Sequence, residues 1–366
     1  MKKLTDIEQN WIKQFYKPLI ISGPCSAESE EQVLKTASRI EKSYIQVFRA
    51  GIWKPRTKPN NFEGIGLDGL PWLQKVKNQT GMMTATEVAK AEHVEGALEH
   101  DIDILWIGAR STVNPFTVQE IADALEGSDK VVLVKNPIHP DLDLWIGALE
   151  RLAGRGIEKL GVIHRGFSTY KKPKFRNQPN WQIALDFKNS YPNIPILCDP
   201  SHICGNRDGI FEIAQQAFNF EYNGLMVETH YDPDQAWSDA KQQIIPEKLL
   251  EILKMIEVRQ HDNPENSEYQ LGLDRMRAQI DELDQNLLSI LADRMRTSQK
   301  VGDLKRAHNV AIFQPDRWEV VLKRSKRTGQ SLGLSEEFTE QFYKAIHQES
   351  VNIQNKIMLK TDEPHQ

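Results

Sequence analysis

The sequence is poor in cysteine and has no long apolar run. Three cysteines, Cys25, Cys198 and Cys204, occur among 366 residues, and no two form a Cys-x-x-Cys pair, which argues against a zinc finger or a thioredoxin-type site. No stretch approaches the roughly 20 apolar residues that span a bilayer. Acidic residues and a tryptophan interrupt the N-terminal segment where a signal peptide needs an unbroken apolar core. We therefore expect a cytoplasmic protein without membrane contact, whose thiols stay reduced.

The sequence also lacks an excess of positive charge. Its formal net charge is −5, which gives no support to binding of nucleic acid. The basic run KRSKR at 323–327 lies in a helical pattern, where a solvated helix face is the simpler explanation. The composition, 39% hydrophobic and 27% charged, is that of a globular protein, and the length favours about two domains. We expect no nucleic-acid partner.

Short apolar runs recur along the first two thirds of the chain, each followed by a helix-like stretch. They lie at 19–23, 45–50, 81–86, 104–109, 131–136, 160–166, 194–199 and 224–229. Continuous rather than alternating apolar runs are typical of strands buried on both faces, as in a parallel sheet. Such βα units predict an α/β fold, a (β/α)₈ TIM barrel. A doubly wound open sheet is the alternative.

Charged side chains, a thiol and an imidazole follow the predicted strands at their C-terminal ends, where barrel enzymes carry functional groups. In chain order they are Cys25, Arg49, Glu87, Arg110, Lys135, Arg165, His202 and Glu228. So many cations, with Lys54 or Arg56 of KPRT added, repel one another unless they are paired. An ion pair with an acidic residue inside the barrel would explain any one of these cations. The whole set predicts multiply anionic small molecules, because guanidinium groups match phosphate and carboxylate oxygens.

A thiol, an imidazole and carboxylates occur among these same ends. Cys25, His202, Glu228 and a later loop acid, Asp239, form a mixed set that suits one divalent metal ion, either Mn, Fe, Co or Zn. Each residue alone has a simpler interpretation, since a buried cysteine or a lone histidine usually belongs to the core. Their spacing matches no compact metal motif, so the prediction depends on the shared position at the strand ends.

The motifs that carry these residues resemble a known family. GPCS, FRAGIWKPRT, IGAR, VKN, HRG, DPSH, MVE and WSD stand in the order found in 3-deoxy-D-arabino-heptulosonate 7-phosphate synthases, most of all in the compact microbial branch. The resemblance implies condensation of phosphoenolpyruvate with erythrose 4-phosphate, the first step of the shikimate pathway. It implies metal binding by Cys25, His202, Glu228 and Asp239; phosphoenolpyruvate binding by Arg49, Lys54, Arg110, Lys135 and Arg165; and erythrose 4-phosphate contacts by Arg56 and Thr57.

Lys54 or a metal-bound water is the candidate for proton transfer in this reaction, with Glu87 a weaker one. Two positions depart from the family pattern: His164 replaces an acidic residue before Arg165, and Pro137 replaces a glycine after VKN. A related synthase that uses arabinose 5-phosphate is the close alternative. The KPRT motif and the segment that follows the barrel argue against it.

The last third of the chain has a different pattern. A polar segment at 260–270 predicts a linker between a barrel domain at 1–259 and an all-α domain at 271–366. A three-four apolar spacing indicates one long helix, with Leu273, Met276, Ile280, Leu283, Leu287, Ile290, Val301 and Leu304. A second helix is expected from Pro315 to near Gly329. Ser335, with acids after it, indicates the start of a third.

Arg294 interrupts the apolar seam of the first helix. A charge there is costly unless it is paired, so either a buried acid or an anionic ligand between helices would explain it. Arg277 and Lys305 lie about 42 Å apart along a straight helix. They therefore serve one small ligand only if Arg277 reaches a partner's site, which requires an intertwined homodimer.

This segment resembles the all-helical chorismate mutases in RAQIDELDQNLLSILADR, VGDLK, QPDRWE and ESVNIQ. The resemblance implies rearrangement of chorismate to prephenate, without nucleophile or metal. The implied site residues are Arg277 of the partner subunit, Arg294, Lys305, Arg317, Ser350 and Gln354, of which Arg294, Lys305 and Gln354 act in catalysis.

Trp318 stands where the mutase family often has a glutamate, with Glu319 one position later, and Gln314 replaces an aspartate. These two replacements leave open which residue contacts the substrate hydroxyl. The alternative to a mutase is a non-catalytic helical module that dimerises and senses ligands. Such sensing suggests a further hypothesis, that chorismate or prephenate bound to the helices inhibits the barrel.

Overall fold

A computed structural model describes residues 3–15, 18–55, 62–169, 174–259 and 267–359. The chain forms two compact units, Met1–His261 and Asp262–Gln366, and each is described by itself. Arg56, Thr57 and positions 260–266 of the expected linker lie outside the described residues. Among the described residues, no helix combines the length and apolarity needed to cross a membrane.

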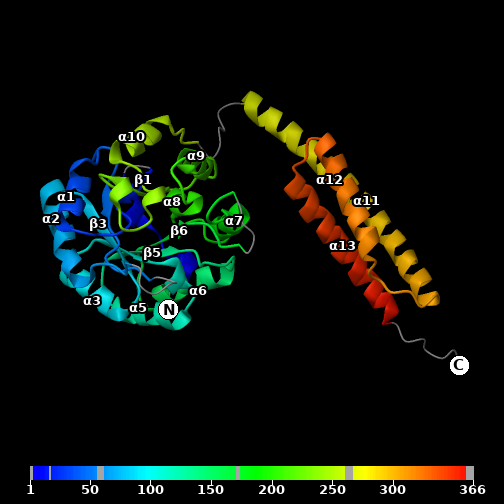
Figure 1. Cartoon of the computed structure of the whole chain (residues 1–366), viewed down its shortest axis with the longest axis horizontal. Helices are drawn as coiled ribbons and strands as arrows, with labels where there is room; N and C mark the ends of the chain where they lie inside the picture. The colour runs from blue at the N-terminus through cyan, green and yellow to red at the C-terminus, as the bar shows by residue number, and fades with distance from the viewer. Residues whose placement is uncertain (1–2, 16–17, 56–61, 170–173, 260–266, 360–366) are drawn as a thin grey trace. The chain divides into compact units, whose positions relative to one another are not determined.

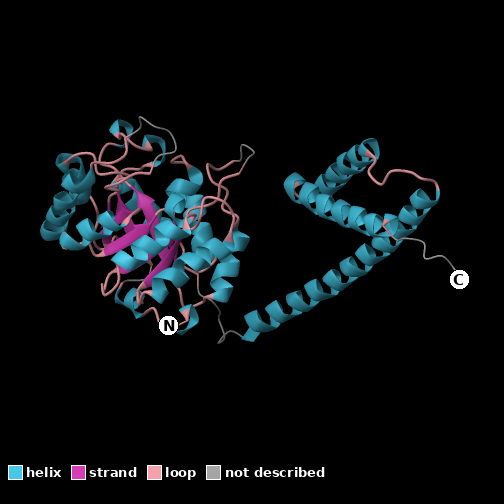
Figure 2. Ribbon diagram, turned by 90° about the horizontal axis from the view of Figure 1, so that it is seen from below, coloured by secondary structure: helices cyan, strands magenta, loops and turns pink. Residues whose placement is uncertain are grey.

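The first unit is a closed parallel barrel with strand order β1 to β8 (Figures 1 and 2). The strands are β1 Leu19–Gly23, β2 Val47–Arg49, β3 Met83–Val88, β4 Ile104–Ile107, β5 Val131–Lys135, β6 Leu160–His164, β7 Ile196–Cys198 and β8 Gly224–Glu228. β1 closes the barrel on β8, with Leu19 opposite Gly224 and Gly23 opposite Glu228. The prediction of an eight-stranded barrel is confirmed, and the open sheet is excluded.

Helices follow the strands on the outside of the barrel. They are α1 Glu30–Ser38, α2 Leu70–Thr80, α3 Ala91–Glu99, α4 Ala109–Thr112, α5 Pro115–Ala124, α6 Leu142–Gly154, α7 Trp181–Ser190, α8 Pro200–Cys204, α9 Ile210–Asn219 and α10 Pro246–Met255. Short 3₁₀ turns are η1 Leu4–Asp6, η2 Asn10–Gln14, η3 Gly66–Gly69, η4 Pro233–Gln235 and η5 Ala240–Gln242. Local chemistry sets the helix starts: Ser29, Asn114 and Asp141 accept backbone N–H groups of the first turns.

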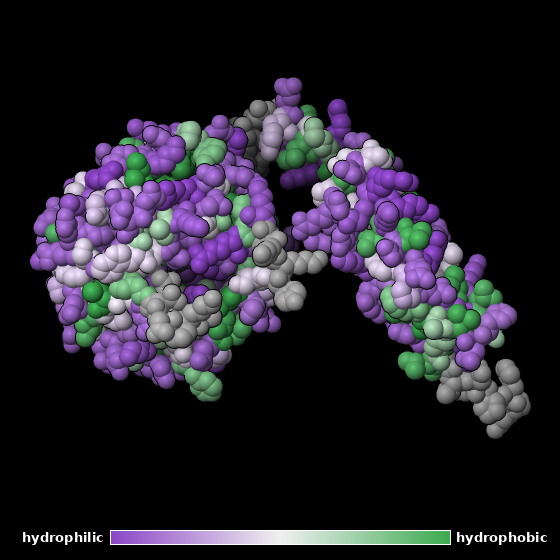
Figure 3. Space-filling view, viewed as in Figure 1, coloured by the Kyte–Doolittle hydropathy of each residue, from purple (hydrophilic) through white to green (hydrophobic). Residues whose placement is uncertain are grey.

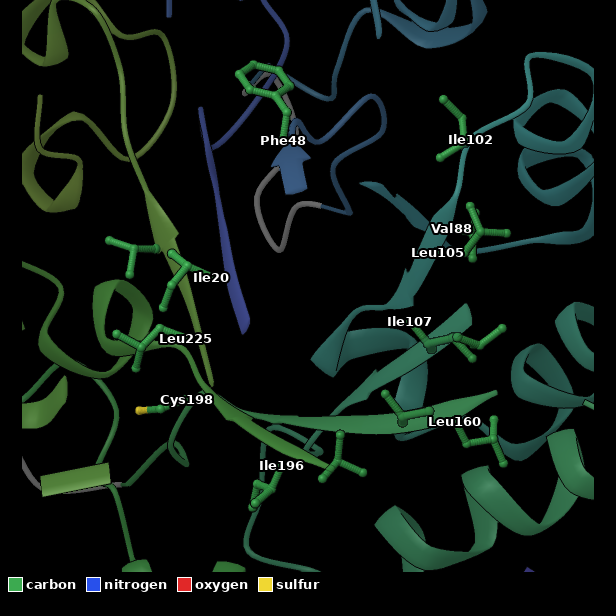
Figure 4. Packing of buried hydrophobic residues seen from close by; sticks show 14 of the residues in the cluster. Ile20, Phe48, Val88, Ile102, Leu105, Ile107, Leu160, Ile196, Cys198 and Leu225 are labelled. Carbon is green, nitrogen blue, oxygen red and sulfur yellow. The ribbon is translucent and has the colours of Figure 1, made fainter. Parts of the chain in front are cut away.

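Apolar side chains fill two layers. One layer lies between strands and helices and includes Ile20, Phe48 and Leu160 (Figure 4). The other fills the barrel interior and includes Leu133 and Trp11 of η2. The Trp11 indole donates a hydrogen bond to the carbonyl of Leu160, at 3.0 Å, so the N-terminal segment is fixed to the barrel strands. Strands buried on both faces explain the continuous apolar runs of the sequence.

The second unit consists of α11 Ser267–Ala307, α12 Pro315–Ser331 and α13 Glu336–Met358. α11 starts inside the 260–270 segment expected as linker. Ser335 caps α13, because its hydroxyl accepts the N–H of Phe338. Gly302 lets α11 approach α13 closely: a Cβ at that position would lie 2.8 Å from the Ile357 side chain. The expected helical architecture is confirmed.

Much of the apolar seam of α11 is exposed in the single chain. Met276, Ile280, Leu283, Leu287 and Ile290 are between 43% and 66% exposed. Figure 3 shows apolar side chains at the surface of this unit. Large apolar side chains repeated along one helix are unusual on a monomer surface and typical of an interaction site.

Candidate active sites

The first site lies at the C-terminal ends of the barrel strands. Cys25 follows β1, Arg49 ends β2, Lys135 ends β5 and Glu228 ends β8. Gly23 makes this arrangement possible, because its φ is 151° and a Cβ there would lie 2.0 Å from the Arg49 carbonyl oxygen. The turn after β1 therefore places Cys25 directly beside the end of β2. This geometry explains the Gly-Pro-Cys stretch at 23–25.

Cys25 is buried between a cation and an acid. Lys54 Nζ donates a hydrogen bond to Cys25 Sγ at 2.5 Å, and the thiol lies 3.3 Å from Asp239 Oδ2. Burial, with a smaller contribution from Glu228, raises the pKa of the Cys25 thiol to about 12, although Lys54 acts in the opposite direction. Burial alone would lower the pKa of Lys54, but Cys25, Glu228 and Asp239 outweigh it and leave the pKa raised.

His202 and Glu228 form a second pair. His202 Nε2 lies 3.8 Å from Glu228 Oε1, while its Nδ1 lies 2.8 Å from Asp199 Oδ2. The Asp199 side chain also accepts a hydrogen bond from the backbone N–H of His202, at 3.0 Å, and thereby caps the short helix α8. A carboxylate behind one ring nitrogen orients the other nitrogen as a ligand. Burial lowers the pKa of His202, which favours the neutral imidazole that metals bind.

Glu228 is held and yet incompletely satisfied. Its Oε2 accepts a hydrogen bond from Gln242 Nε2 at 2.7 Å, whereas its buried Oε1 makes no hydrogen bond with any residue that the structure describes. Asp239 has φ of 47°, a conformation uncommon for residues with a side chain. Glu228 thus stands at the end of β8, and Asp239 directly precedes η5 in the loop that follows.

These four side chains agree with a divalent metal in chemistry but lie as two pairs. Over the described ranges, no group of three or more His, Cys, Asp or Glu side chains is arranged to hold an ion. A thiol, an imidazole and two carboxylates suit a transition metal. Glu228 Oε1 is a buried acceptor that receives no hydrogen bond from any described residue, although Arg49 and His202 lie within ion-pair distance, as expected of a ligand oxygen.

Arg49 is the most deeply buried cation of the site. Its Nη2 donates to the Cys25 carbonyl at 3.0 Å and lies 3.5 Å from Glu228 Oε1. Its Nε and Nη1 are buried and make no hydrogen bond with described residues. The guanidinium carbon lies 4.7 Å from the centroid of the Trp106 ring. Two buried donors without acceptors indicate a place for an anionic ligand.

Lys135 is paired with a buried acid, whereas Arg165 is held by a neutral amide. Lys135 Nζ is 2.8 Å from Asp199 Oδ2, and Arg165 Nη1 donates to Asn177 Oδ1 at 2.8 Å. Burial lowers the pKa of Arg165 to about 10, so the guanidinium stays charged at neutral pH. The Arg110 charge acts on Arg165 from α4 in the same direction. Ion pairing inside the barrel therefore accounts for part of this cation set.

The two departures from the family pattern have local explanations. His164 belongs to the outer layer: its Nδ1 lies 2.9 Å from Tyr222 Oη and its Nε2 lies 2.6 Å from the Pro179 carbonyl. Pro137 lies next to Asn136, whose side-chain Nδ2 donates hydrogen bonds to the carbonyl oxygens of Pro137 and Gly166. Glu87 accepts a hydrogen bond from Trp106 Nε1 at 2.9 Å, which makes it a support for the indole.

Sequence reasoning missed Arg176 and the glutamines after β8. Arg176 Nη1 lies 3.1 Å from Asp239 Oδ1 and donates to Gln242 Oε1 at 2.7 Å. Gln243 Oε1 accepts the backbone N–H of Cys25 at 3.0 Å. None of these residues stands at a strand end, so the strand-end rule had no signal for them.

The second site is a cavity of about 480 Å³ within the helical unit. Predicted residues that line it are Arg294, Lys305, Arg317, Ser350 and Gln354, together with Gln314 and Trp318. Arg294, Lys305 and Arg317 give it positive charge, and no described acid lines it. The volume is that of a small-molecule pocket.

Hydrogen bonds orient the groups of this cavity. Arg294 Nη1 donates to Ser350 Oγ at 2.6 Å, which answers the question of the charged seam position: Arg294 faces the cavity. Lys305 Nζ donates to the Ile312 carbonyl at 2.5 Å. Gln354 Nε2 donates to Ser298 Oγ at 3.1 Å, while Gln354 Oε1 is buried without a partner among described residues.

Arg277 does not belong to this cavity within one chain. It is exposed on α11, and 17 helical residues place it about 26 Å from Arg294 along the axis. Sequence reasoning missed His347, Ile312 and Val321, which also line the cavity. His347 and Val321 lie one helical turn from Ser350 and Arg317, so a spacing argument could have included them, whereas Ile312 lies in the loop between α11 and α12.

Comparison with known proteins finds a matching family for each of the two units. Residues 9–262 match the DAHP synthetase I family, and residues 276–355 match chorismate mutase type II. The phospho-2-dehydro-3-deoxyheptonate aldolase of Thermotoga maritima is 32% identical over 235 residues, 64% of this chain and 68% of that protein. The 2-dehydro-3-deoxyphosphooctonate aldolase of Desulfatibacillum aliphaticivorans is 29% identical over 263 residues, 65% of this chain and 90% of that protein.

A solved structure supports the same assignment. The crystal structure of the Thermotoga maritima DAHP synthase has a TM-score of 0.59 at 31% identity, and the match covers 64% of this chain and 67% of that one. A barrel with cations at its strand ends, joined to a helical unit with a cationic cavity, defines a two-domain enzyme of aromatic biosynthesis. The chain belongs to the DAHP synthetase I family and carries a C-terminal chorismate mutase type II domain. Both resemblances seen in the sequence are confirmed.

Proposed function

We propose that the barrel condenses phosphoenolpyruvate with erythrose 4-phosphate to 3-deoxy-D-arabino-heptulosonate 7-phosphate. The observation that carries this proposal is the buried Arg49 guanidinium, two of whose nitrogens make no hydrogen bond with any described residue, beside the Cys25, His202, Glu228 and Asp239 donor set. The reaction joins the methylene carbon of the enol phosphate to the aldehyde carbon, adds water to the enol carbon and releases phosphate. It therefore needs an anion pocket next to a group that polarises the aldehyde.

The residues divide this work by position. Arg49, Lys135 and Arg165 would hold the phosphate and carboxylate oxygens through charge-assisted hydrogen bonds. Lys54 and Arg110 would complete this pocket, with Lys54 beside the reacting carbons for proton transfer. Arg56 and Thr57, outside the described residues, would contact the second phosphate. Positioning the two substrates together accounts for much of such a bimolecular rate.

The DAHP synthase family is generally metal-dependent, and we propose that Cys25, His202, Glu228 and Asp239 hold one divalent ion of Mn, Fe, Co or Zn. When bound, the ion supplies Lewis acidity to the aldehyde oxygen. Cys25 would bind the ion as a thiolate, because coordination favours the deprotonated thiol despite its raised pKa. Gln242, Asp199 and the Arg49 contact would orient the ligands.

Consumption of phosphoenolpyruvate tests this proposal. The purified protein is assayed with erythrose 4-phosphate and separately with arabinose 5-phosphate, because one relative is named for the octonate product. We expect turnover with erythrose 4-phosphate, loss on chelation and recovery with added metal. Preference for arabinose 5-phosphate would overturn the substrate assignment, and full activity of verified metal-free protein would overturn the metal assignment.

For the helical unit we propose rearrangement of chorismate to prephenate. Arg294 and Arg317 would hold the two carboxylates. Lys305 would stabilise the charge that develops on the ether oxygen. A half-turn of the Gln354 amide would let its Oε1 accept from the Ser298 hydroxyl and its Nε2 donate to the same ether oxygen, so the buried orphan would be satisfied. Chorismate disappearance, followed by absorbance, tests this.

We further propose that the active form is a homodimer through α11. The exposed seam of Met276, Ile280, Leu283 and Leu287 would pack on a second copy, and Arg277 of the partner subunit would complete the cavity. Ligand binding there would also inhibit the barrel. In the full chain, Arg294→Ala should then remove inhibition of condensation by prephenate; unchanged inhibition would exclude this route.

A further inference from the structure

One side chain in the helical cavity has no role in the proposed rearrangement. His347 lies on α13, three residues before Ser350, so both point to the same side of the helix, and both line the cavity. The ring of His347 lies 4.1 Å from the Trp318 ring, at an interplanar angle of 33°. The Phe313 ring contacts it edge-on at 6.0 Å. Two aromatic neighbours therefore fix the plane of the imidazole.

The imidazole is held neutral and is available to a ligand. Burial lowers the pKa of His347, and the positive charges of Arg294 and Lys305 lower it further. A neutral ring has one donor and one acceptor nitrogen. Within the described part of the chain, neither nitrogen makes a hydrogen bond, although Arg294 and Ser350 nearby bond each other.

The position of Trp318 explains why a histidine is useful here. Trp318 lines the cavity, whereas Glu319, one residue later, does not, because one residue turns a helical side chain by about 100°. No described acid lines the cavity to accept a hydrogen bond from a substrate hydroxyl. Chorismate carries such a hydroxyl on its ring, in addition to its carboxylates and ether oxygen.

We propose that His347 binds the ring hydroxyl of the substrate, and that Trp318 positions His347 for this contact. This inference rests on the proposed mutase function. It makes His347 a specificity residue: the contact distinguishes chorismate from an analogue without the hydroxyl. Carboxylate binding stays with Arg294 and Arg317, so the rearrangement itself does not depend on His347.

The test compares two substrates in the full-length protein. kcat and KM are measured with chorismate and with its analogue that lacks the ring hydroxyl, for the wild type, His347→Leu, His347→Gln, Trp318→Leu and Gln314→Leu. Phosphoenolpyruvate consumption by the barrel and the far-ultraviolet circular dichroism show that each variant is folded. Gln314→Leu is the matched control, because Gln314 also lines the cavity and could otherwise meet the hydroxyl.

We expect His347→Leu to lower kcat/KM for chorismate about two- to tenfold, the range of one neutral hydrogen bond, and to leave the analogue unchanged. His347→Gln should restore most of the loss, and Trp318→Leu should resemble His347→Leu. Equal losses on both substrates, or a hydroxyl-specific loss only in Gln314→Leu, would overturn the inference. A wild type that rearranges neither substrate would instead overturn the proposed mutase function.

Discussion

Lys54 Nζ lies 2.5 Å from Cys25 Sγ, so a lysine ammonium stands directly beside the thiol proposed as a metal ligand. This contact places positive charge next to Cys25, Glu228 and Asp239. If Cys25 bound the proposed ion, the Lys54 ammonium would have to leave the sulfur for the enol phosphate that it is proposed to hold. The contact would then link the proposed metal subsite to the proposed anion subsite.

Replacing Cys25 with alanine removes one of the proposed ligands and the acceptor of the Lys54 hydrogen bond. We expect Cys25→Ala to lose bound metal, measured by atomic spectroscopy after dialysis. Condensation activity should fall at least about a hundredfold, because even residues that only support a metal ligand change metal affinity by up to about that factor. Cys204→Ala is the control, since Cys204 is buried in α8 outside the donor set. Metal content equal in both variants would contradict the ligand assignment.

The buried pair of Lys135 and Asp199 predicts a large effect on stability. Asp199→Asn would leave the Lys135 charge buried and remove the support of His202. Breaking such a pair typically costs about 3–5 kcal/mol in the free energy of unfolding. The exposed pair of Lys159 and Asp129, at 2.6 Å, offers a matched control, because Asp129→Asn should cost less than about 1 kcal/mol.

Calorimetry of the barrel transition measures both variants. Similar unfolding temperatures for Asp199→Asn and Asp129→Asn would show that the buried pair contributes no more than a surface pair.

How far the sequence determined the barrel site can be judged from single residues. Cys25, Arg49, Lys135 and Glu228 were predictable, because parallel strands bring their C-terminal ends to one edge and the apolar runs mark where each strand stops. His164 was misleading as a departure from a motif, since alternation along β6 turns its ring to the outer layer while Arg165 faces the site.

Other residues were beyond local patterns. Arg176 reaches Asp239 across 63 positions of sequence, and loop conformation alone decides that contact. In the helical unit, periodicity placed Arg294 and Lys305 on one face, but the rotation that brings Trp318 and His347 together depends on how α12 packs on α13.

His164 also predicts a pH dependence of barrel stability. Burial lowers its pKa from 6.5 to about 4, so the folded state keeps the ring neutral while the unfolded chain takes up a proton below about pH 6.5. The contribution of this histidine is therefore complete above pH 6.5 and is lost as the pH falls toward 4. The loss amounts to roughly 3 kcal/mol at most.

Denaturant unfolding between pH 7 and pH 4.5 checks this expectation. His164→Gln, which does not titrate, should flatten the pH dependence, while His139→Gln at an exposed loop position should leave it as in the wild type. A wild-type curve that His164→Gln does not change would show that other groups dominate.

The proposed dimer makes a prediction about Arg277 and Arg294, because each mutase site would combine residues of two subunits. If the cavity of one protomer is completed by Arg277 of the partner subunit, Arg277→Ala and Arg294→Ala should each lower mutase activity at least about a hundredfold, and condensation should continue in both. A dimer of one variant with the other then holds one site with both arginines and one site with neither. Mixing the two inactive variants should therefore restore activity.

Random exchange of the two variants makes half of the dimers mixed, so the restored mutase activity should approach about a quarter of the wild-type value. The control mixes Arg277→Ala with an Arg277→Ala Arg294→Ala double variant, which contains no intact pair in any combination. No recovery after verified subunit exchange would mean that Arg277 acts within its own chain or not at all. Because about 26 Å of helix separates Arg277 from Arg294, the first possibility would require α11 to bend back on itself, and only the second would be compatible with the straight helix.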